Sequence, residues 1–340
     1  MGPRASIPLV SLPREYVVIV TGGDTGIGYE TAKFIAMMGP TVIVACRSKE
    51  KAERAFEQMN EEFQQEKEQG TQNIISDDRL RLEFAKLDLA SLKSTMDFVE
   101  GFKASSRKLH VLICNAGVMM SDEIITEDKY ELTYQVNYLS QFLIMAHFLP
   151  IMKTSGNDVR IVLVSSAAHK HCHYDPNYAA GERMKKHDPL QCYSNTKLYQ
   201  IMQMYSIDRM LEKTHVELYS VHPGYVSKDL YRRNRHFGKR FNCFRCCLKC
   251  LCMIKTPRKG SATSIYAAVS PELKGLSRAY FTHSRDAAEF PSNTARDREL
   301  QDYLLQCTID NLRDLLPQEF IQEALNTVKR TSTKAGSSNH

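Results

Sequence analysis

Short, continuous apolar runs alternate along this chain with longer segments in which apolar residues recur at helical spacing. The apolar runs lie at 16–21, 41–45, 80–87, 111–114, 159–164, 216–221 and 278–282. A strand that is apolar on both of its faces fits a parallel sheet with helices packed on each side. We therefore expect an α/β protein with one doubly wound parallel sheet, arranged as three α/β/α layers in a single domain.

Size and composition exclude several classes of protein. With 340 residues, of which 43% are hydrophobic and 25% charged, the chain is neither disordered nor fibrous and can bury a substantial core. Its 45 Lys and Arg against 39 Asp and Glu give a net charge of +6, too small for a general nucleic-acid binder. No run of about 18 apolar residues occurs, so we expect any membrane contact to be peripheral. Prolines and arginines break up the N-terminal segment, and the ten cysteines then indicate a reduced, cytosol-facing protein.

A glycine-rich turn, TGGDTGIG at 21–28, follows the first apolar run and opens directly into a helical segment. Glycines let the backbone turn tightly and approach a pyrophosphate, whose charge is met by the free N–H groups and the positive end of the helix. The position of the turn predicts the nucleotide site of a Rossmann-type fold. The alternative is an ordinary tight connection between a strand and a helix.

Arg47 stands at the end of the second apolar run. Dinucleotide folds that prefer NAD place a carboxylate there, about 20 residues after the glycine-rich turn, to bind the ribose 2′-hydroxyl. A guanidinium can instead pair with a 2′-phosphate through two hydrogen bonds, so Arg47 favours NADP. The alternative is a solvated arginine at the start of a helix.

Two tyrosine–lysine pairs have the spacing that puts both side chains on one helix face: Tyr193 with Lys197, and Tyr29 with Lys33. A nearby cation lowers the pKa of a phenol towards the range that acid–base catalysis needs. With 16 tyrosines in the chain, the spacing alone means little. Polar residues at the ends of other elements, Ser166 and Asn137 among them, favour Tyr193, and we expect Tyr29 to pack beside the phosphate site.

Taken in order, these motifs resemble those of the short-chain dehydrogenase/reductase family over residues 16–307. They are TGGDTGIG at 21–28, DL at 88–89, CNAG at 114–117, Asn137, Ser166, YSNTK at 193–197 and HPG at 222–224. Three further motifs, ACR at 45–47, VSSAAH at 164–169 and TSIYAAVSPEL at 263–273, are similar to the retinol-dehydrogenase-like branch.

The resemblance implies a role for each matching residue. Tyr193 would donate or accept the proton, and Lys197 would lower its pKa and hold the nicotinamide ribose. Ser166 would bind the substrate oxygen, Asn137 would position a water in a proton relay from Lys197, and Asp88 would meet the adenine. The cofactor would be NADP, with no metal, and its site would comprise Gly22, Asp24, Thr25, Gly26, Ile27, Gly28, Arg47, Asp88, Leu89, Asn115, Ala116, Gly117, Tyr193, Lys197, Pro223, Gly224, Val226 and Ser227.

The expected activity is NADP(H)-dependent interconversion of an alcohol and a carbonyl on a lipophilic substrate, with retinoids, steroids and polyisoprenoids all open. Two residues depart from the family pattern. Cys114 replaces the first Asn of the usual NNAG, and Lys228 replaces a Thr that helps to anchor the nicotinamide carboxamide. The intact set of Asn137, Ser166, Tyr193 and Lys197 favours an enzyme, whereas Lys228 keeps open a catalytically weak scaffold or signalling protein with the same fold.

A basic, cysteine-rich segment at 225–260 lies where the family covers its substrate. Between residues 231 and 260 it holds ten Lys or Arg and no carboxylate, with cysteines at 243, 246, 247, 250 and 252. A zinc site, a substrate lid and a basic helix that lies on a membrane, with S-acylated cysteines, are the three interpretations, and the last is favoured. We expect peripheral contact through 232–259 with the cytosolic face of an internal membrane, endoplasmic reticulum or lipid droplet. No nucleic-acid partner is expected, and a homodimer is left open.

The expected division of the chain is an N-terminal extension at 1–14, the catalytic Rossmann domain at 15–307, a C-terminal helical segment at 308–330 and a flexible tail at 331–340. The polar stretch 60–78 is expected to be a loop or a frayed helix end.

Overall fold

The computed structural model describes residues 7, 9–212, 214–226 and 254–336. Ser227, Lys228, the five clustered cysteines and most of the basic segment lie outside the described residues, and so do the predictions made for them.

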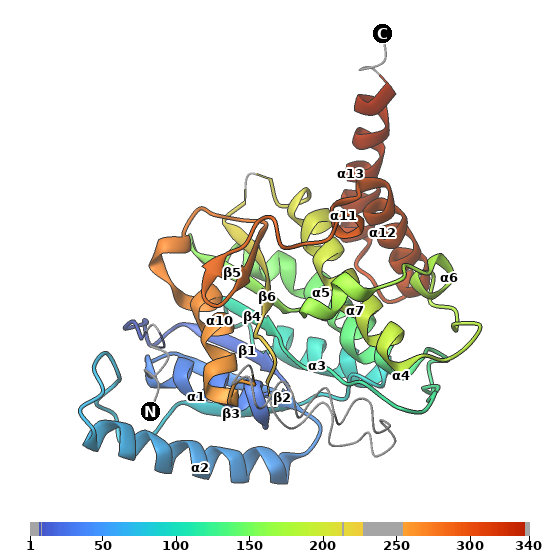
Figure 1. Ribbon diagram of the computed structural model, residues 1–340. Helices are drawn as coiled ribbons and strands as arrows, with labels where there is room; N and C mark the ends of the chain where they lie inside the picture. Colours follow the sequence, from blue (N-terminus) through green and yellow to red (C-terminus); the bar gives the residue numbers. More distant parts are fainter. Residues whose placement is uncertain (1–6, 8, 213, 227–253, 337–340) are drawn as a thin grey trace.

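One eight-stranded sheet forms the centre of the molecule, with the strands in the order β3-β2-β1-β4-β5-β6-β7-β8 (Figure 1). Strands β1 to β7 pair in parallel, and β8 is antiparallel to β7. Their bounds are β1 Val17–Thr21, β2 Thr41–Cys46, β3 Leu82–Lys86, β4 Val111–Cys114, β5 Val159–Val164, β6 Val216–His222, β7 Ala279–Thr282 and β8 Arg285–Asp286. All seven predicted strands are present, and the order reverses between β1 and β4, as in a doubly wound fold.

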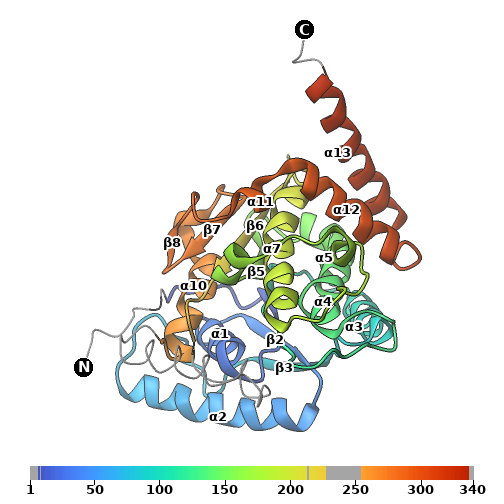
Figure 2. The ribbon, with the colours of Figure 1, turned by 45° about the vertical axis from the view of Figure 1, so that its right-hand side comes forward.

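Helices cover both faces of the sheet (Figures 1 and 2). The two faces are built from alternating side chains of the same strands, because Val18 and Val20 join one hydrophobic cluster whereas Ile19 joins the other. Helices α1 Gly26–Met37, α2 Lys49–Glu68 and α10 Pro257–Val269 pack on the first cluster. The second is covered by α3 Leu92–Ala104, α5 Ser140–Lys153, α7 Pro189–Asp208, α12 Arg298–Leu312 and α13 Gln318–Gly336.

Short elements complete the connections. They are α4 Leu132–Tyr134, a π-helical turn Gln135–Leu139, a 3-10 turn Ala167–His171, α6 Pro176–Ala179, a second 3-10 turn Pro271–Leu273 and α11 Asn293–Arg296. The last helix, α13, extends away from the rest of the molecule in both ribbon views (Figures 1 and 2). The expected boundaries at 307 and 330 fall inside α12 and α13, and the division of the chain there stays a prediction.

The expectation of a loop or a frayed helix end at 60–78 is wrong for the first half of that stretch, because α2 continues as a regular helix to Glu68. Phe63 is fully buried there on the inner face of the helix, and the Glu66 carboxylate pairs with Arg258 of α10 at 2.6 Å. The apolar residues on this face are sparse among charged ones, so tertiary packing holds a helix that its composition only weakly indicates.

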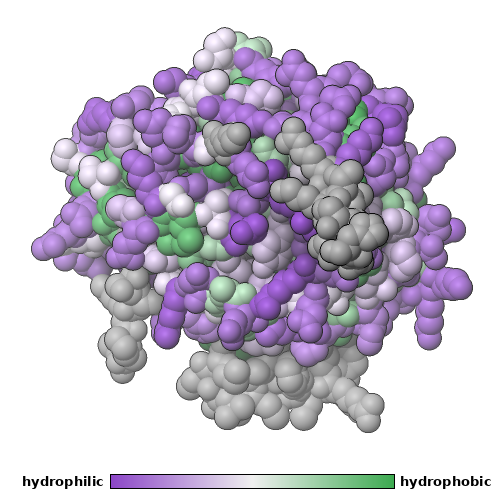
Figure 3. All heavy atoms as spheres, turned by 90° about the horizontal axis from the view of Figure 1, so that it is seen from above, coloured by the Kyte–Doolittle hydropathy of each residue, from purple (hydrophilic) through white to green (hydrophobic). Residues whose placement is uncertain are grey.

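The face of the molecule that is seen from above is largely hydrophilic (Figure 3). Seen from above, hydrophobic side chains occupy only small, separate areas (Figure 3). No helix among the described residues is long and apolar enough to cross a membrane.

Candidate active site

The glycine-rich turn leaves no room for side chains at its centre. Gly22 and Gly26 have φ values of +62° and +60°, which favour glycine. A Cβ on Gly28 would lie 2.2 Å from the Gly22 carbonyl oxygen and 2.5 Å from Nδ2 of Asn115. The backbone therefore comes unusually close to itself where α1 begins. The first N–H groups of a helix have no acceptor within it and can bind an anion. Asp24, Thr25 and Ile27 complete this turn.

Asn115 joins the turn to the neighbouring strand. Its Nδ2 donates to the carbonyl oxygens of Thr21 (3.0 Å) and Gly22 (3.3 Å), and the backbone N–H groups of Asn115 and Ala116 donate to the Thr21 hydroxyl at 3.0 Å. These bonds join the carboxyl ends of β1 and β4, where the strand order reverses and α/β folds bind their ligands.

The remaining predicted residues of the nucleotide side lie at the same edge of the sheet. Arg47 directly follows β2, is exposed and makes no ion pair with another described residue. Burial, and next the Asp24 carboxylate, raise the pKa of the Cys46 thiol at the end of β2 to about 12. Asp88 and Leu89 follow β3, and Asp88 Oδ1 accepts from the Ala90 N–H at 3.0 Å.

Lys197 is buried in α7, with its side chain 3% exposed. Its Nζ donates to the Val164 carbonyl oxygen at 2.7 Å and to Oε1 of Gln200 at 3.0 Å. The same Nζ lies 5.5 Å from the centre of the Tyr193 ring, within cation–π range. Burial lowers the pKa of Lys197 to about 7.

Asn137 is fully buried in the π-helical turn that precedes α5, and such turns are frequent at functional sites. Its Oδ1 accepts from the Val118 N–H at 2.7 Å, and its Nδ2 donates to the Thr196 hydroxyl at 3.2 Å. Gly117 fits between Asn137 and Lys197, since an added Cβ would lie 3.4 Å from Asn137 Oδ1 and 3.6 Å from Lys197 Nζ.

Gln200 was not predicted as a site residue. Its Nε2 donates to the Asn137 carbonyl oxygen at 3.0 Å, while its Oε1 accepts from Lys197 Nζ. One amide therefore bridges the two groups between which a relay water was expected. The sequence carries a weak signal for it, because Gln200 lies three residues after Lys197 and so on the same helix face.

Ser166 follows β5 and precedes the 3-10 turn Ala167–His171, where its hydroxyl accepts from the Ala168 N–H at 3.2 Å. His222 holds this segment close to the next strand. Its Nδ1 lies 3.3 Å from the Ala167 N–H and 3.4 Å from the Gly224 N–H, and accepts from both. Burial, and next the charge of Lys255, lower the pKa of His222 to about 3, so the imidazole is neutral.

Lys255 is a second residue that sequence reasoning missed. It pairs with Val226 as an isolated bridge, and its N–H donates to the Tyr225 carbonyl oxygen at 2.7 Å. A Cβ on Gly224, whose φ is +88°, would lie only 2.9 to 3.0 Å from the end of the Lys255 side chain. The lysine therefore crosses the Pro223–Gly224 turn, where the nicotinamide was predicted, although the chain separates the two by some thirty residues.

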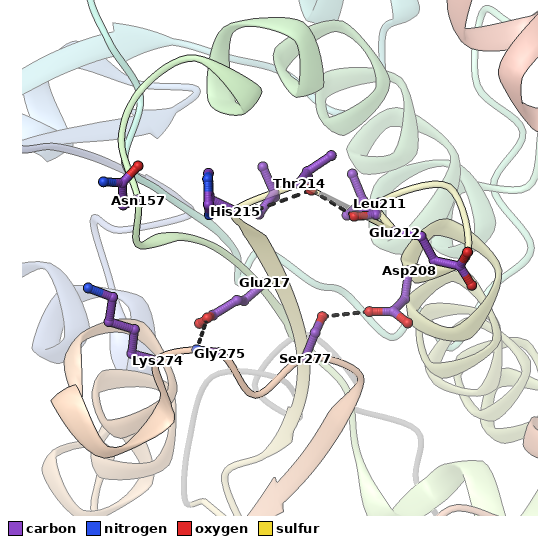
Figure 4. Close-up of a pocket in the computed structure, with 11 residues that line it drawn as sticks. Asn157, Asp208, Leu211, Glu212, Thr214, His215, Glu217, Lys274, Gly275 and Ser277 are labelled. Carbon is purple, nitrogen blue, oxygen red and sulfur yellow. Dashed lines mark hydrogen bonds between the residues drawn. The ribbon is translucent and has the colours of Figure 1, made fainter.

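A cavity of about 290 Å³ lies elsewhere, at the amino end of β6 (Figure 4). Its lining includes Asp208 and Glu217, which are already engaged by the Ser277 hydroxyl and by the Gly275 N–H. None of the predicted site residues lines it. The residues that form the candidate active site lie instead at the carboxyl edge of the sheet.

A model of the short chain dehydrogenase family matches residues 16–237. The chain belongs to this family. Human polyprenol dehydrogenase is 34% identical over 312 residues, 88% of this chain and 86% of that protein. Human retinol dehydrogenase 11 is 37% identical over 276 residues, 80% and 78% of the two chains. These relatives confirm the likeness to the retinol-dehydrogenase-like branch.

Solved structures confirm the Rossmann-type fold. An actinorhodin polyketide ketoreductase, crystallised with NADPH, has a TM-score of 0.59 and 16% identity, covering 80% of this chain and 97% of that one. The family consists of oxidoreductases that use nicotinamide cofactors, and this chain is an oxidoreductase of that kind.

Proposed function

We propose that this protein uses NADP(H) to interconvert an alcohol and a carbonyl on a lipophilic substrate. The observation that carries the proposal is the buried Lys197 ammonium, which lies beside the Tyr193 ring and is linked through Gln200 to Asn137. A hydride donor and a proton donor are both needed to reduce a carbonyl. The cofactor supplies the hydride when it is bound, and the chain supplies the proton.

In this mechanism, Tyr193 donates the proton to the substrate oxygen as the carbonyl is reduced, and takes it back when the alcohol is oxidised. The positive charge of Lys197 favours the phenolate that remains on Tyr193. The Ser166 hydroxyl donates to the same substrate oxygen and holds it in place. The glycine-rich turn fits the pyrophosphate, because a side chain at Gly28 would strike the backbone on which the phosphate rests.

The preference for NADP over NAD rests on Arg47, which is exposed directly after β2 and is not ion-paired to another described residue. We expect Arg47→Glu to weaken NADPH about tenfold to a hundredfold, since an attraction to the 2′-phosphate becomes a repulsion. NADH should be affected much less. Fluorescence titration measures both affinities, and an equal loss for the two cofactors would show that Arg47 does not contact the phosphate.

The lipophilic substrate is supported by the names of the relatives, polyprenol dehydrogenase and retinol dehydrogenase 11. Two large apolar side chains also remain exposed close in sequence to site residues: Leu190, 44% exposed, at the start of α7, and Tyr225, 41% exposed, after Gly224. The test is NADPH oxidation by the purified protein with a panel of polyisoprenoid, retinoid and steroid aldehydes and ketones. NADPH binding without turnover of any of them would favour the scaffold alternative.

Peripheral membrane contact through 232–259 is part of the proposal and rests on the sequence of that segment. Lys or Arg near an anionic surface contributes about 1 kcal/mol each, and acylated cysteines would add firmer anchoring. The test replaces its five cysteines with serine and four of its cations with glutamate, and follows liposome flotation. Unchanged flotation of this variant, or a wild-type protein that does not float at low salt, would leave the substrate-lid interpretation.

A further inference from the structure

Three metal-ligating side chains meet behind the first turn of α7. They are Glu131, directly before α4, His187, directly before the Asp188 cap of α7, and Cys192 within its first turn. Their ligand atoms all lie within 4.8 Å of one another. Glu131 and Cys192 are 3% and 1% exposed, so the cluster is not a group of solvated surface side chains.

The carboxylate of Glu131 has one oxygen engaged and one orphaned. Oε2 accepts from the Tyr134 N–H at 2.9 Å and from the Tyr178 hydroxyl at 2.7 Å. Oε1 is buried and has no hydrogen-bond partner among the described residues. Buried polar atoms are nearly always satisfied, so an orphaned carboxylate oxygen beside a thiol and an imidazole indicates a missing partner.

The distances suit a small tetrahedral ion. Cys192 Sγ lies 3.7 Å from His187 Nδ1. Bonds of 2.3 Å to sulfur and of 2.0–2.1 Å to nitrogen place the two ligand atoms of a tetrahedral zinc about 3.6 Å apart. The Met184 sulfur lies 3.8 Å from Sγ and borders the cluster. A carboxylate in the set favours Zn²⁺ over Cu⁺, because Cu⁺ prefers soft ligands such as thiolates and thioethers.

We propose that Glu131, His187 and Cys192 bind a Zn²⁺ ion. The Cys192 thiol releases its proton to solvent as the sulfur–zinc bond forms, and Glu131 binds through Oε1 while Tyr178 holds Oε2. The ion joins two segments that are far apart in sequence, the start of α4 and the start of α7. Glu131 leads through α4 into the turn that carries Asn137, and Cys192 directly precedes Tyr193, so the ion would hold the elements that carry these two residues.

The experiment uses the full chain with the five cysteines at 243–252 replaced by serine, so that this segment contributes no zinc. The protein is stripped with a chelator, titrated with Zn²⁺, and its bound zinc is measured by mass spectrometry after gel filtration. We expect one equivalent, and we expect Cys192→Ser and His187→Gln each to lose it. Cys307→Ser, which removes a half-buried thiol in α12, is the matched control and should keep it.

Two further measurements make the result independent of folding and of catalysis. Co²⁺ in place of Zn²⁺ should give a thiolate-to-metal absorption band in the Cys307→Ser variant and none in Cys192→Ser. Tyr178→Phe keeps all three ligands and should weaken zinc about 10- to 100-fold, because it releases the carboxylate. Zinc retained by both Cys192→Ser and His187→Gln, or no binding at micromolar zinc by a chain folded by circular dichroism, would overturn the proposal whether or not the enzyme turns over.

Discussion

Helices α1 and α7 each carry a tyrosine and a lysine four residues apart, and the surroundings of the two pairs are opposite. In α1, Lys33 pairs with the carboxylates of Glu30 and Glu62, and the Tyr29 hydroxyl donates to Glu62 at 3.2 Å. In α7, the acceptors of Lys197 are a carbonyl and an amide oxygen, both neutral. One lysine is neutralised by its partners, and the other is not.

The state of each tyrosine depends on that of its lysine. Burial, and next Glu62, raise the pKa of Tyr29 well above its ordinary value, so Tyr29 keeps its proton. Beside Tyr193, the positive charge of Lys197 is not neutralised by a carboxylate among the described residues and can stabilise a phenolate. Burial lowers the pKa of Lys197 to about 7. The spacing of two residues brings them together on one helix face, whereas neighbours from elsewhere in the chain decide what the pair can do.

The largest expected effect separates the two tyrosines. Tyr193→Phe removes the transferable proton and should lower turnover by at least about a hundredfold, with NADPH binding nearly unchanged. Tyr29→Phe should leave turnover close to wild type, because that phenol only packs and bonds Glu62. Steady-state NADPH oxidation and cofactor titration on both variants test this, and an inactive Tyr29 variant beside an active Tyr193 variant would reverse the assignment.

The two lysines should affect the stability of the folded protein in opposite ways: near pH 7 the buried charge of Lys197 opposes folding, whereas the paired charge of Lys33 favours it. Lys197 binds a proton more weakly when folded, so between pH 7 and its unfolded pKa near 10.5 the unfolded chain holds more protons, and stability rises with pH. Relative to Lys197→Met, the wild-type free energy of unfolding should rise by about 1.4 kcal/mol per pH unit between pH 7 and 9.

Lys33→Met is the matched variant in α1. It leaves Glu30 and Glu62 without their cation and should destabilise the protein by about 1 to 3 kcal/mol, with turnover retained. Lys197→Met should lose turnover at every pH. Urea denaturation at pH 7, 8 and 9 gives the slopes, and a flat difference between wild type and Lys197→Met would mean that Lys197 is not held in a weakly basic state.

A smaller effect is expected at Gln200, which bridges Lys197 and Asn137. Gln200→Leu removes an acceptor from the Lys197 ammonium, so the pKa of Lys197 falls further. As pH rises, the variant should therefore lose turnover at a lower pH than the wild type does. A loss of about tenfold at neutral pH is expected. Gln203→Leu is the control, since Gln203 is buried one turn further along α7 and bonds the Met145 sulfur. Identical pH profiles for all three proteins would limit Gln200 to a packing role.

Features of this protein that depend only on residues close together in the sequence were predictable. Seven strands were found from apolar runs, because a strand buried on both faces must be apolar throughout. The turn at 21–28 was predicted from its glycines. The structure shows why a glycine is needed at position 28, where a side chain would clash with the backbone of Gly22. The extent of α2 was not found, because Phe63 and the Glu66–Arg258 pair depend on α10, far along the chain.

The doubly wound fold, the family and the two candidate tyrosine–lysine pairs could all be predicted from the sequence, since each depends on local pattern and spacing. The three-dimensional contacts show which lysine has no carboxylate among its described partners, that Gln200 and Lys255 reach the site, and that Glu131, His187 and Cys192 meet. Charge and hydrogen bonding act over a few ångströms in space, and burial strengthens them by excluding water. In this protein, the groups that provide these charges and hydrogen bonds come from elements that lie far apart along the chain.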